Sequence, residues 1–451
     1  MARIATAPDS PAGLGERAFY AFTLALAAGP LDRLVYEHQL PSVARAAAWG
    51  MVYLGFALLL QRRPRSMLAA YRRVWPLLLM PAYALASVIW SVRPAQSAVG
   101  ALELAAAIVF GAALGCRVDE RRLLALVVAV LGILAVADMA ATLFSPEGLD
   151  INGEAVGIFS HKNANGGMMA TTALAATAVV VFGGGRLVAL PVAAIAVVAL
   201  GMSGSRTSWV AAIAGLLTIL AMLARRLRPP ARPVALLLGV AGLCALGLGV
   251  LGSGVDVVRL FFAATGKDTT LTGRTDLWYL AWGFIHGAPV LGHGFDAFWT
   301  NDPTSDAAFV NEVVQDHLKS FHNGLLEAAV DLGWVGTGLQ LALMAAFLGP
   351  VARLARRGDP AAAAFAAALL VQVAFTNLSE VALFVRHGFD LLLLSALWSR
   401  AQVPAPRPAG RRRKPPAPPG CGEAGGPEAG DGWGTVRPLP ALPGSDQGQP
   451  Q

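Results

Sequence analysis

Residues 122–144 read RLLALVVAVLGILAVADMAATLF, an apolar run interrupted by a single acidic residue, Asp138. A helix of about 20 such residues crosses the ~30 Å hydrocarbon core of a membrane. Isolated strands are excluded, because lipid cannot satisfy their backbone N–H and C=O groups. The pattern recurs along the chain, which predicts an all-α, polytopic membrane protein with about 12 transmembrane helices. We expect spans at 18–31, 43–60, 74–91, 98–115, 122–144, 167–183, 187–203, 207–224, 233–251, 324–349, 360–377 and 381–398.

The composition agrees with a membrane protein. Of the 451 residues, 55% are hydrophobic and only 14% are charged, whereas soluble domains carry about 25% charged residues. The net charge is +7, but the arginines lie between the apolar runs, where they set topology, so no nucleic-acid partner is expected. Cys116, Cys244 and Cys421 are scattered without metal-ligand spacing, which argues against a metal site or a disulfide framework.

The distribution of basic residues predicts the orientation, because cytoplasmic links are enriched in Lys and Arg. The first run has no small-residue cleavage site, so we expect a retained span rather than a signal peptide. Residues 1–17 are then a cytoplasmic N-terminus, and 18–400 form the transmembrane domain. Residues 401–451, rich in Pro, Gly and Arg, are expected to be a disordered cytoplasmic tail. The links predicted to be inside hold Arg62, Arg63, Arg65, Arg72, Arg73, Arg117, Arg121, Arg122, Arg186, Arg225, Arg226, Arg228, Arg232, Arg353, Arg356 and Arg357.

One long segment, about 252–322, breaks the apolar pattern on the predicted outer side. Residues 274–286 within it predict a helix with two Trp residues, which favour the membrane–water interface. We expect an interfacial helix on the outer membrane surface. The alternative is a small helical cap packed on the spans. Gly287–Gly294, with Pro289, predicts a turn.

Two arginines on this side suit a phosphorylated ligand. Arg206 begins a span after Gly204-Ser205, and Arg274 opens the predicted interfacial helix. A guanidinium presents a fork of donors that matches phosphate oxygens two at a time. The alternatives are a snorkelling interfacial residue for Arg206 and a surface pair with Asp276 for Arg274.

His322 and Asn323 stand at the entrance of the span that follows. An imidazole with a pKa near 6.5 can accept a proton at neutral pH, so His322 is a candidate general base. A capping or interfacial role is the alternative, and His293 is a rival base. Glu327 lies four residues before Asp331 on one helix face. Such carboxylates are costly in lipid and should face a protein or water cavity, where they could orient a base or bind sugar hydroxyls.

The segment His161-Lys162-Asn163 could bind sugar hydroxyls or phosphate, or it could be a simple loop. Glu380, Arg386 and His387 flank the outer end of the last predicted span and could pair structurally or line the site. No P-loop or HExxH motif is present, and Asp302 with Asp306 is a weak metal signal. We therefore expect no cofactor and a metal-independent reaction.

In their order and shared sidedness, these motifs resemble the O-antigen ligase and O-antigen polymerase family, and residues 159–163 resemble its exopolysaccharide polymerase branch. The resemblance implies a bacterial inner-membrane glycosyltransferase that takes a glycan from undecaprenyl pyrophosphate at the periplasmic face. The acceptor would be a sugar of the lipid A core or another lipid-linked glycan. Arg206 and Arg274 match the family's pyrophosphate-binding arginines, and His322 its proposed catalytic histidine. The motifs are Ser205-Arg206-Thr207, Gly273-Arg274-Thr275-Asp276-Leu277-Trp278, Gly292-His293-Gly294-Phe295 and His322-Asn323-Gly324-Leu325-Leu326-Glu327.

Two other classes of protein compete with this interpretation. A secondary transporter would place charges near the bilayer midplane and often shows internal repeats, whereas here the polar residues gather at one edge. A non-catalytic scaffold for envelope assembly would not need Arg and His gathered on one side. The sequence does not separate ligase from polymerase, and it does not identify the sugar.

Overall fold

The computed structural model describes residues 12–31, 33, 42–226 and 274–403. The expected span at 233–251, the first part of the long loop and nearly all of the predicted tail lie outside the described residues. The chain divides into two units, Met1–Pro404 and Ala405–Gln451, and every described residue belongs to the first. Every named regular element of the described chain is a helix, which confirms the all-α prediction.

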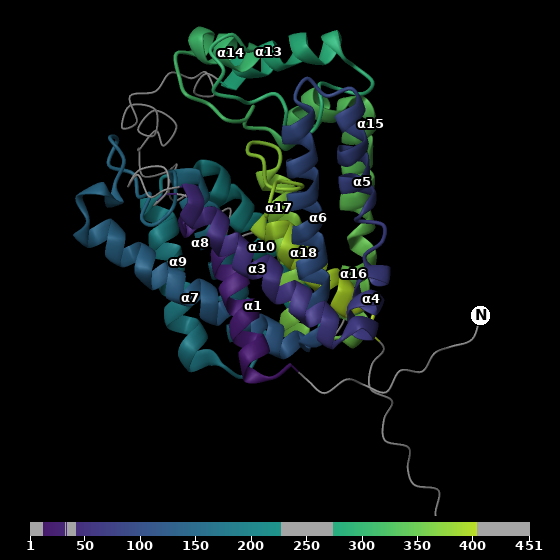
Figure 1. Ribbon diagram of the computed structural model, residues 1–451. Coiled ribbons are helices and arrows are strands. Elements are labelled where there is room, and N and C mark those ends of the chain that lie inside the picture. The colour runs from purple at the N-terminus through teal and green to yellow at the C-terminus, as the bar shows by residue number, and fades with distance from the viewer. Residues whose placement is uncertain (1–11, 32, 34–41, 227–273, 404–451) are drawn as a thin grey trace, which may run out of the picture. The chain divides into compact units, whose positions relative to one another are not determined.

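Figure 1 labels the helices in their order along the chain. In the described N-terminal half they are α1 (Leu14–Ala27), α3 (Ser42–Arg62), α4 (Pro64–Arg73), α5 (Leu79–Ala86), α6 (Pro94–Arg117), α7 (Glu120–Phe144), α8 (Lys162–Phe182), α9 (Arg186–Met202) and α10 (Arg206–Ala224). In the C-terminal half they are α13 (Arg274–Gly287), α14 (Asp306–Val314), α15 (Gly324–Ala346), α16 (Leu348–Arg357), α17 (Pro360–Thr376) and α18 (Phe389–Ala401). Short 3-10 turns lie at Ser87–Ile89 and Pro146–Gly148.

Six helical segments of the described chain are long and apolar enough to cross a membrane. Three shorter apolar helices accompany them: Leu79–Ile89, Arg186–Met202 and Pro360–Thr376. Large apolar side chains such as Ile133 and Phe144 remain exposed on α7, as expected where lipid replaces water as the solvent. The chain is therefore a multi-pass membrane protein. The full number of spans stays a prediction.

Close packing of small residues joins α6 to α18 at the centre of this unit. A Cβ atom added at Gly111 would collide with the carbonyl oxygen of Leu392, and one at Gly115 with that of Ala396. Two glycines four residues apart on one face let helix backbones approach, which is a common way for helices to associate in lipid. These contacts fix α18, and with it the loop that precedes α18.

The expected span at 381–398 is wrong at its start, because α18 begins only at Phe389. The preceding residues form a loop in which Phe384 and His387 have φ values of 59° and 47°. Asn377 supports this loop, since its side-chain oxygen accepts the backbone N–H groups of Ala382 and Leu383, both at 3.2 Å. Irregular backbone is tolerated at membrane depth where protein buries it. The apolar residues before Phe389 therefore form a loop rather than a helix.

The expected span at 74–91 is also interrupted. The chain turns after α4, through a segment containing Pro76, and α5 runs only from Leu79 to Ala86 before a 3-10 turn. Proline lacks a backbone N–H and fixes φ, so it disfavours a continuous helix at this point.

The expected span at 324–349 contains a kink. Within α15, Gly333 has a φ of 64°, a region that suits glycine. A Cβ there would collide with the carbonyl of Val290. The freed backbone groups of α15 bond to the turn after α13. The N–H of His293 donates to Val330 O at 2.9 Å, and that of Trp334 donates to Pro289 O at 2.9 Å.

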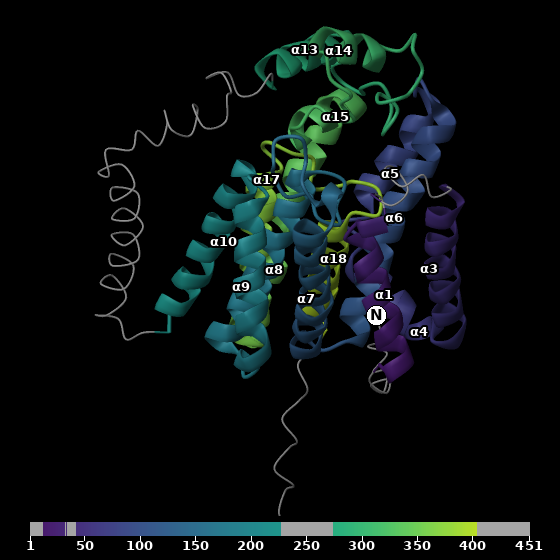
Figure 2. The ribbon, with the colours of Figure 1, turned by 90° about the vertical axis from the view of Figure 1, so that its left-hand side faces the viewer.

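The helix expected at 274–286 is present as α13, and it packs as a cap against α14 and α15 (Figures 1 and 2). Leu277, Ala281 and Ile285 are buried in one cluster with Phe321 and Val330. The opposite side of α13 leaves Tyr279 and Trp282 exposed. The cap alternative is therefore the better description of its contacts, while its placement at a membrane surface stays a prediction.

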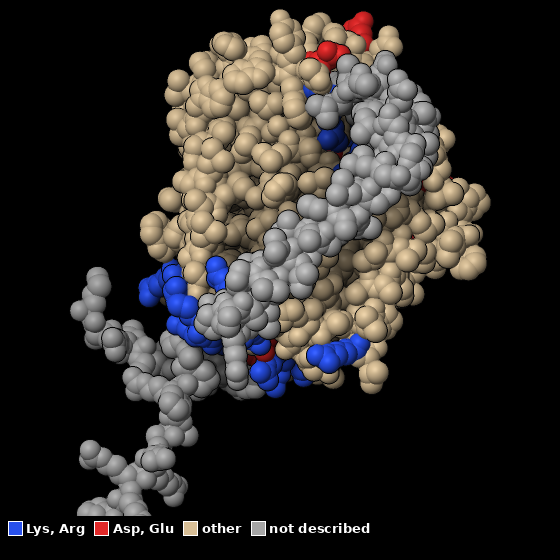
Figure 3. All heavy atoms as spheres, turned by 180° about the vertical axis from the view of Figure 1, so that it is seen from behind, with Lys and Arg blue, Asp and Glu red and all other residues tan. Residues whose placement is uncertain are grey.

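Charge is unevenly distributed along the unit. Figure 3 shows Lys and Arg gathered at the end away from α13 and α14, while acidic side chains are visible at the α13–α14 end. Arg62, Arg121 and Arg357 were all assigned to inner links from the sequence, and each lies at or next to the end of a helix. The pattern agrees with the orientation expected from the positive-inside rule.

Candidate functional site

Glu380, in the loop before α18, joins three of the motifs that the sequence singled out. Its Oε1 atom accepts from Asn163 Nδ2 at 2.7 Å and from Arg274 Nη2 at 2.5 Å. Its Oε2 atom lies 2.8 Å from His322 Nδ1. We call these four residues the Glu380 cluster. They come from α8, α13, the entrance of α15 and the loop before α18, so the fold gathers residues that are distant in the chain.

The Glu380 carboxylate is held ionised by its partners. Burial alone would raise the pKa of this carboxyl, and its side chain is only 13% exposed. The hydrogen bond and charge of His322, with the charges of Arg274 and His161, outweigh burial and lower the pKa below its ordinary value. A negative charge is therefore fixed beside both Arg274 and His322.

The backbone of His322 is held in an unusual conformation. Its φ is 47°, in the left-handed region, which costs a residue other than glycine roughly 1 kcal/mol or more. The next residue, Asn323, caps α15, because its side-chain oxygen accepts from the N–H groups of Leu325 at 3.0 Å and Leu326 at 3.2 Å. The cap fixes the point where the helix begins and so positions the imidazole. Strained backbone of this kind concentrates at functional sites.

The ring of His322 is oriented for proton transfer. A neutral imidazole that donates from Nδ1 to a carboxylate keeps Nε2 as the acceptor. The contact with Glu380 favours that tautomer. The geometry therefore leaves Nε2 as the basic nitrogen, with a carboxylate behind it to stabilise the imidazolium that forms when a proton is taken.

Four helix N-termini carry the motifs. His161 caps α8, with its Nδ1 atom accepting the N–H of Ala164 at 3.2 Å. Ser205 caps α10, and Asn323 caps α15. Arg274 is the first residue of α13. A helix N-terminus carries partial positive charge and unsatisfied N–H groups, so this arrangement favours an anionic ligand.

A second carboxylate, Glu154, interacts with the two other basic residues of the motifs, Lys162 and Arg206. Lys162 forms an ion pair with Glu154, and Arg206 lies close enough to Glu154 for their charges to interact. The α10 N-terminus is tied to the Glu380 loop, because Ser379 Oγ donates to Thr207 Oγ1 at 2.9 Å. Arg206 and the Glu380 cluster are thus linked through adjacent residues.

The charges of this region do not cancel. Three cationic side chains, Lys162, Arg206 and Arg274, face two carboxylates, Glu154 and Glu380. The surplus is positive before the helix N-termini are considered. The region can accept a dense negative charge such as a pyrophosphate while keeping a base beside it.

Glu327, also expected to bind substrate, lies on the other side of the His322 segment. Its Oε2 atom accepts the backbone N–H of Phe321 at 2.7 Å. Asp331, one turn further along α15, accepts the N–H of Asp296 at 2.8 Å. Both carboxylates line a cavity of about 240 Å³, as expected for acidic residues on an apolar span.

The weaker sequence candidates have structural roles. His293 lies in the turn that braces α15, and its Nε2 atom lies 3.1 Å from the carbonyl oxygen of Phe284. Asp302 pairs with Arg93 at 3.1 Å. Within the described ranges, no three His, Cys, Asp or Glu residues are grouped to hold a metal ion.

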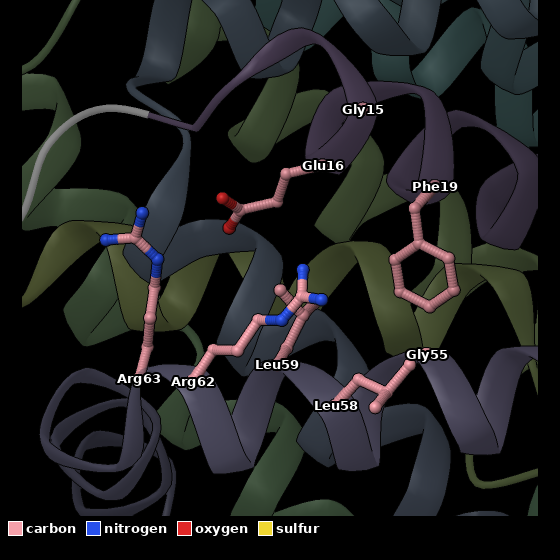
Figure 4. Close-up of a pocket in the computed structure, with 8 residues that line it drawn as sticks. All are labelled: Gly15, Glu16, Phe19, Gly55, Leu58, Leu59, Arg62 and Arg63. Carbon is pink, nitrogen blue, oxygen red and sulfur yellow. The ribbon is translucent and has the colours of Figure 1, made fainter.

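A further cavity lies away from the Glu380 cluster. It measures about 330 Å³ and lies between α1 and α3, where Figure 4 shows Glu16, Arg62 and Arg63 around it. Glu16 is already bound to Arg117 at 2.7 Å. None of its lining residues contributes to the Glu380 cluster.

Glu380 and Glu154 carry more of the site than the sequence indicates. Glu380 is recognisable only as a residue flanking the last span, and Glu154 stands in a loop without a motif. A usable signal is the gathering of Arg, Lys and His motifs on the predicted outer side, since such side chains need nearby carboxylates to orient them.

Comparisons with known proteins extend these observations. Residues 191–341 match the family model described as O-Antigen ligase. That region contains Arg206, Arg274 and His322. A stretch of 133 residues is 32% identical to the exopolysaccharide production protein ExoQ of Rhizobium meliloti (strain 1021), covering 28% of this chain and 30% of that relative. The chain therefore spans less than a third of the length of this relative in the match. Both findings confirm the resemblance to O-antigen ligase and polymerase proteins.

Proposed function

We propose that this protein is a glycosyltransferase of surface polysaccharide biosynthesis, which moves a glycan from undecaprenyl pyrophosphate to a sugar hydroxyl. The observation that carries the proposal is the joint hold of Glu380 on Arg274 and His322. One carboxylate orients a pyrophosphate-binding fork and a base toward a common point. We place the reaction at the periplasmic face of the bacterial inner membrane, in line with the basic residues gathered at the opposite end.

The reaction follows from this division of roles. His322 Nε2 takes the proton of the acceptor hydroxyl as its oxygen attacks the anomeric carbon of the donor sugar. The bond between that carbon and the pyrophosphate oxygen breaks, and undecaprenyl pyrophosphate leaves with the electron pair. Arg274 and Arg206 stabilise the charge that grows on the leaving group. A single displacement inverts the anomeric centre, and the proton passes from His322 to water.

The acceptor distinguishes two forms of this activity. A ligase passes the glycan to the lipid A core, and a polymerase passes it to another lipid-linked repeat unit. The family match favours the first form by its description, O-Antigen ligase. The relative named for exopolysaccharide production favours the second. We retain O-antigen ligase type as the broad assignment and exopolysaccharide or O-antigen polymerase as the alternative.

Deletion of the gene followed by gel analysis of surface glycans tests both forms. Loss of all long chains from lipopolysaccharide indicates a ligase, and a single attached repeat indicates an O-antigen polymerase. Normal lipopolysaccharide with loss of secreted polymer indicates exopolysaccharide synthesis. Unchanged glycans of every class would contradict the proposed function. Movement of lipid-linked glycan that survives both Arg206→Ala and His322→Ala would favour a transporter instead.

A further inference from the structure

The cavity beside the Glu380 cluster has a polar wall of unusual composition. It lies between the first turns of α15, the loop before α18 and the segment after Gly294. Three carboxylates and two cationic side chains line it: Asp296, Glu327, Asp331, Lys319 and Arg386. Three aromatic residues also line it: Phe295, Trp299 and Phe384.

The carboxylates are fixed in place by the fold. Asp331 is only 6% exposed, and both Asp331 and Glu327 accept a backbone N–H group, at 2.8 Å and 2.7 Å. Arg386 is paired with Asp296 and lies 3.8 Å from Glu103. A carboxylate has about four lone-pair sites, so one backbone contact orients each group and leaves acceptor capacity for a ligand.

The chemistry of this wall selects the class of ligand. Three carboxylates outnumber Lys319 and Arg386, and Arg386 is already paired with Asp296, so the cavity is a poorer site for the donor's pyrophosphate than the Glu380 cluster. In the part of the chain that the structure covers, no three ligating side chains are grouped to hold a metal ion. Neutral hydroxyl groups can donate to the carboxylates and accept from Arg386, while aromatic rings cover the apolar face of a sugar. Carboxylate hydrogen bonds of this kind are strong.

The volume and position of the cavity indicate how large its ligand can be and which catalytic residue lies near it. About 240 Å³ is below the roughly 300–1,000 Å³ of drug-sized ligand sites, which suits one sugar ring rather than an oligosaccharide. Ser320 and Gly324 of its wall lie two residues on either side of His322, and Val381 follows Glu380 directly. Residues that flank the proposed base in the sequence therefore form part of the cavity wall.

We propose that this cavity binds the terminal sugar ring of the acceptor glycan and presents its hydroxyl to His322. The inference rests on the proposed function. It divides the site by charge, because the positive Glu380 side takes the pyrophosphate and the carboxylate-lined cavity takes the neutral acceptor. Asp331 and Asp296 are assigned to acceptor binding, and neither contacts the donor headgroup.

The test uses the full chain in lipid nanodiscs with two variants of the cavity. Asp331→Asn removes one charge and keeps the shape, whereas Val385→Trp fills the space and leaves the carboxylates unchanged. The donor is the lipid-linked glycan extracted from the source bacterium. The acceptor probe is the free saccharide released from that glycan by mild acid. Glu312→Gln, an exposed carboxylate on α14 outside this cavity, is the control.

The saccharide concentration for half-maximal transfer should rise about tenfold or more in Asp331→Asn, the size expected for losing a hydrogen bond to a charged group. Val385→Trp should raise it as well, while the dissociation constant for undecaprenyl pyrophosphate stays within about twofold. Glu312→Gln should match the wild type in both measurements.

Different outcomes would overturn the cavity assignment and the proposed function. Transfer by the wild type with an unchanged saccharide dependence in both variants overturns the cavity assignment alone. A parallel loss of undecaprenyl pyrophosphate binding in Val385→Trp also overturns it, because the cavity would then belong to the donor. Absence of any transfer by the wild type overturns the proposed function together with the cavity assignment.

Discussion

His322 Nδ1 lies 2.8 Å from Glu380 Oε2, and the other oxygen of the same carboxylate holds Arg274. The proposed base, His322, and the proposed phosphate-binding guanidinium of Arg274 are therefore positioned by the same carboxylate. A change in the charge of Glu380 acts on both groups at once, although this side chain need not touch substrate. Glu380 is thus a positioning residue whose influence should exceed that of an ordinary ion pair.

Glu380→Gln should lower transfer by about 10- to 100-fold, since the neutral amide weakens the charge-assisted hydrogen bonds to Asn163, Arg274 and His322. The pH–rate profile should also change, because the imidazolium of His322 loses its counter-charge. Radiolabelled glycan transfer measured between pH 5.5 and 8.5 checks both effects. A variant with the wild-type rate and the wild-type profile would show that Glu380 does not position the base.

Glu380 also predicts a limit to stability in acid. Its pKa lies below the ordinary value of 4.5, so the folded protein holds this proton less tightly than the unfolded chain. Its contribution is present at neutral pH and is lost as pH falls below about 4.5 through the folded pKa. The difference in melting temperature between wild type and Glu380→Gln should shrink in that range. A difference that stays unchanged as the pH falls through the acid range would contradict this assignment.

Arg274→Lys should remain strongly impaired although it keeps the charge. An ammonium is a point charge and cannot form the planar two-point contact of a guanidinium with phosphate oxygens. The expected loss is about tenfold or more in transfer rate, with weaker binding of undecaprenyl pyrophosphate. Arg93→Lys is the matched control, because Arg93 pairs with Asp302 at 3.1 Å away from the cluster. Equal activity of both variants would remove Arg274 from the proposed clamp.

The sequence predicts the long helices well and the broken ones poorly. The run at 122–144 becomes α7, Glu120–Phe144, because an apolar stretch of that length in lipid has few alternatives to a helix. The run at 381–398 failed because apolar residues such as Leu383 and Phe384 are equally suited to a buried loop. Asn377 satisfies the backbone of that loop, and the apolar pattern of the sequence does not indicate this side-chain contact.

In the site, too, the sequence indicates the residue types but not the contacts between distant segments. Arg274, His322 and Asn163 could be selected because their types and predicted side pointed to one chemistry. Glu380 could not be identified as their common partner, because those contacts join residues 106, 58 and 217 positions apart. Only the packing of the helices brings them together. The division between a positive cluster and an acidic cavity is likewise a property of the folded chain.

Transfer by the purified protein, with His322→Ala beside the wild type, tests the central claim most directly. The donor is radiolabelled lipid-linked glycan, and undecaprenyl pyrophosphate binding is measured in parallel. We expect the wild type to give a product with inverted anomeric configuration in the presence of a chelator. His322→Ala should lower transfer by about 10²- to 10⁴-fold while binding undecaprenyl pyrophosphate nearly as tightly. Full transfer by His322→Ala, or retained configuration in the product, would contradict the account.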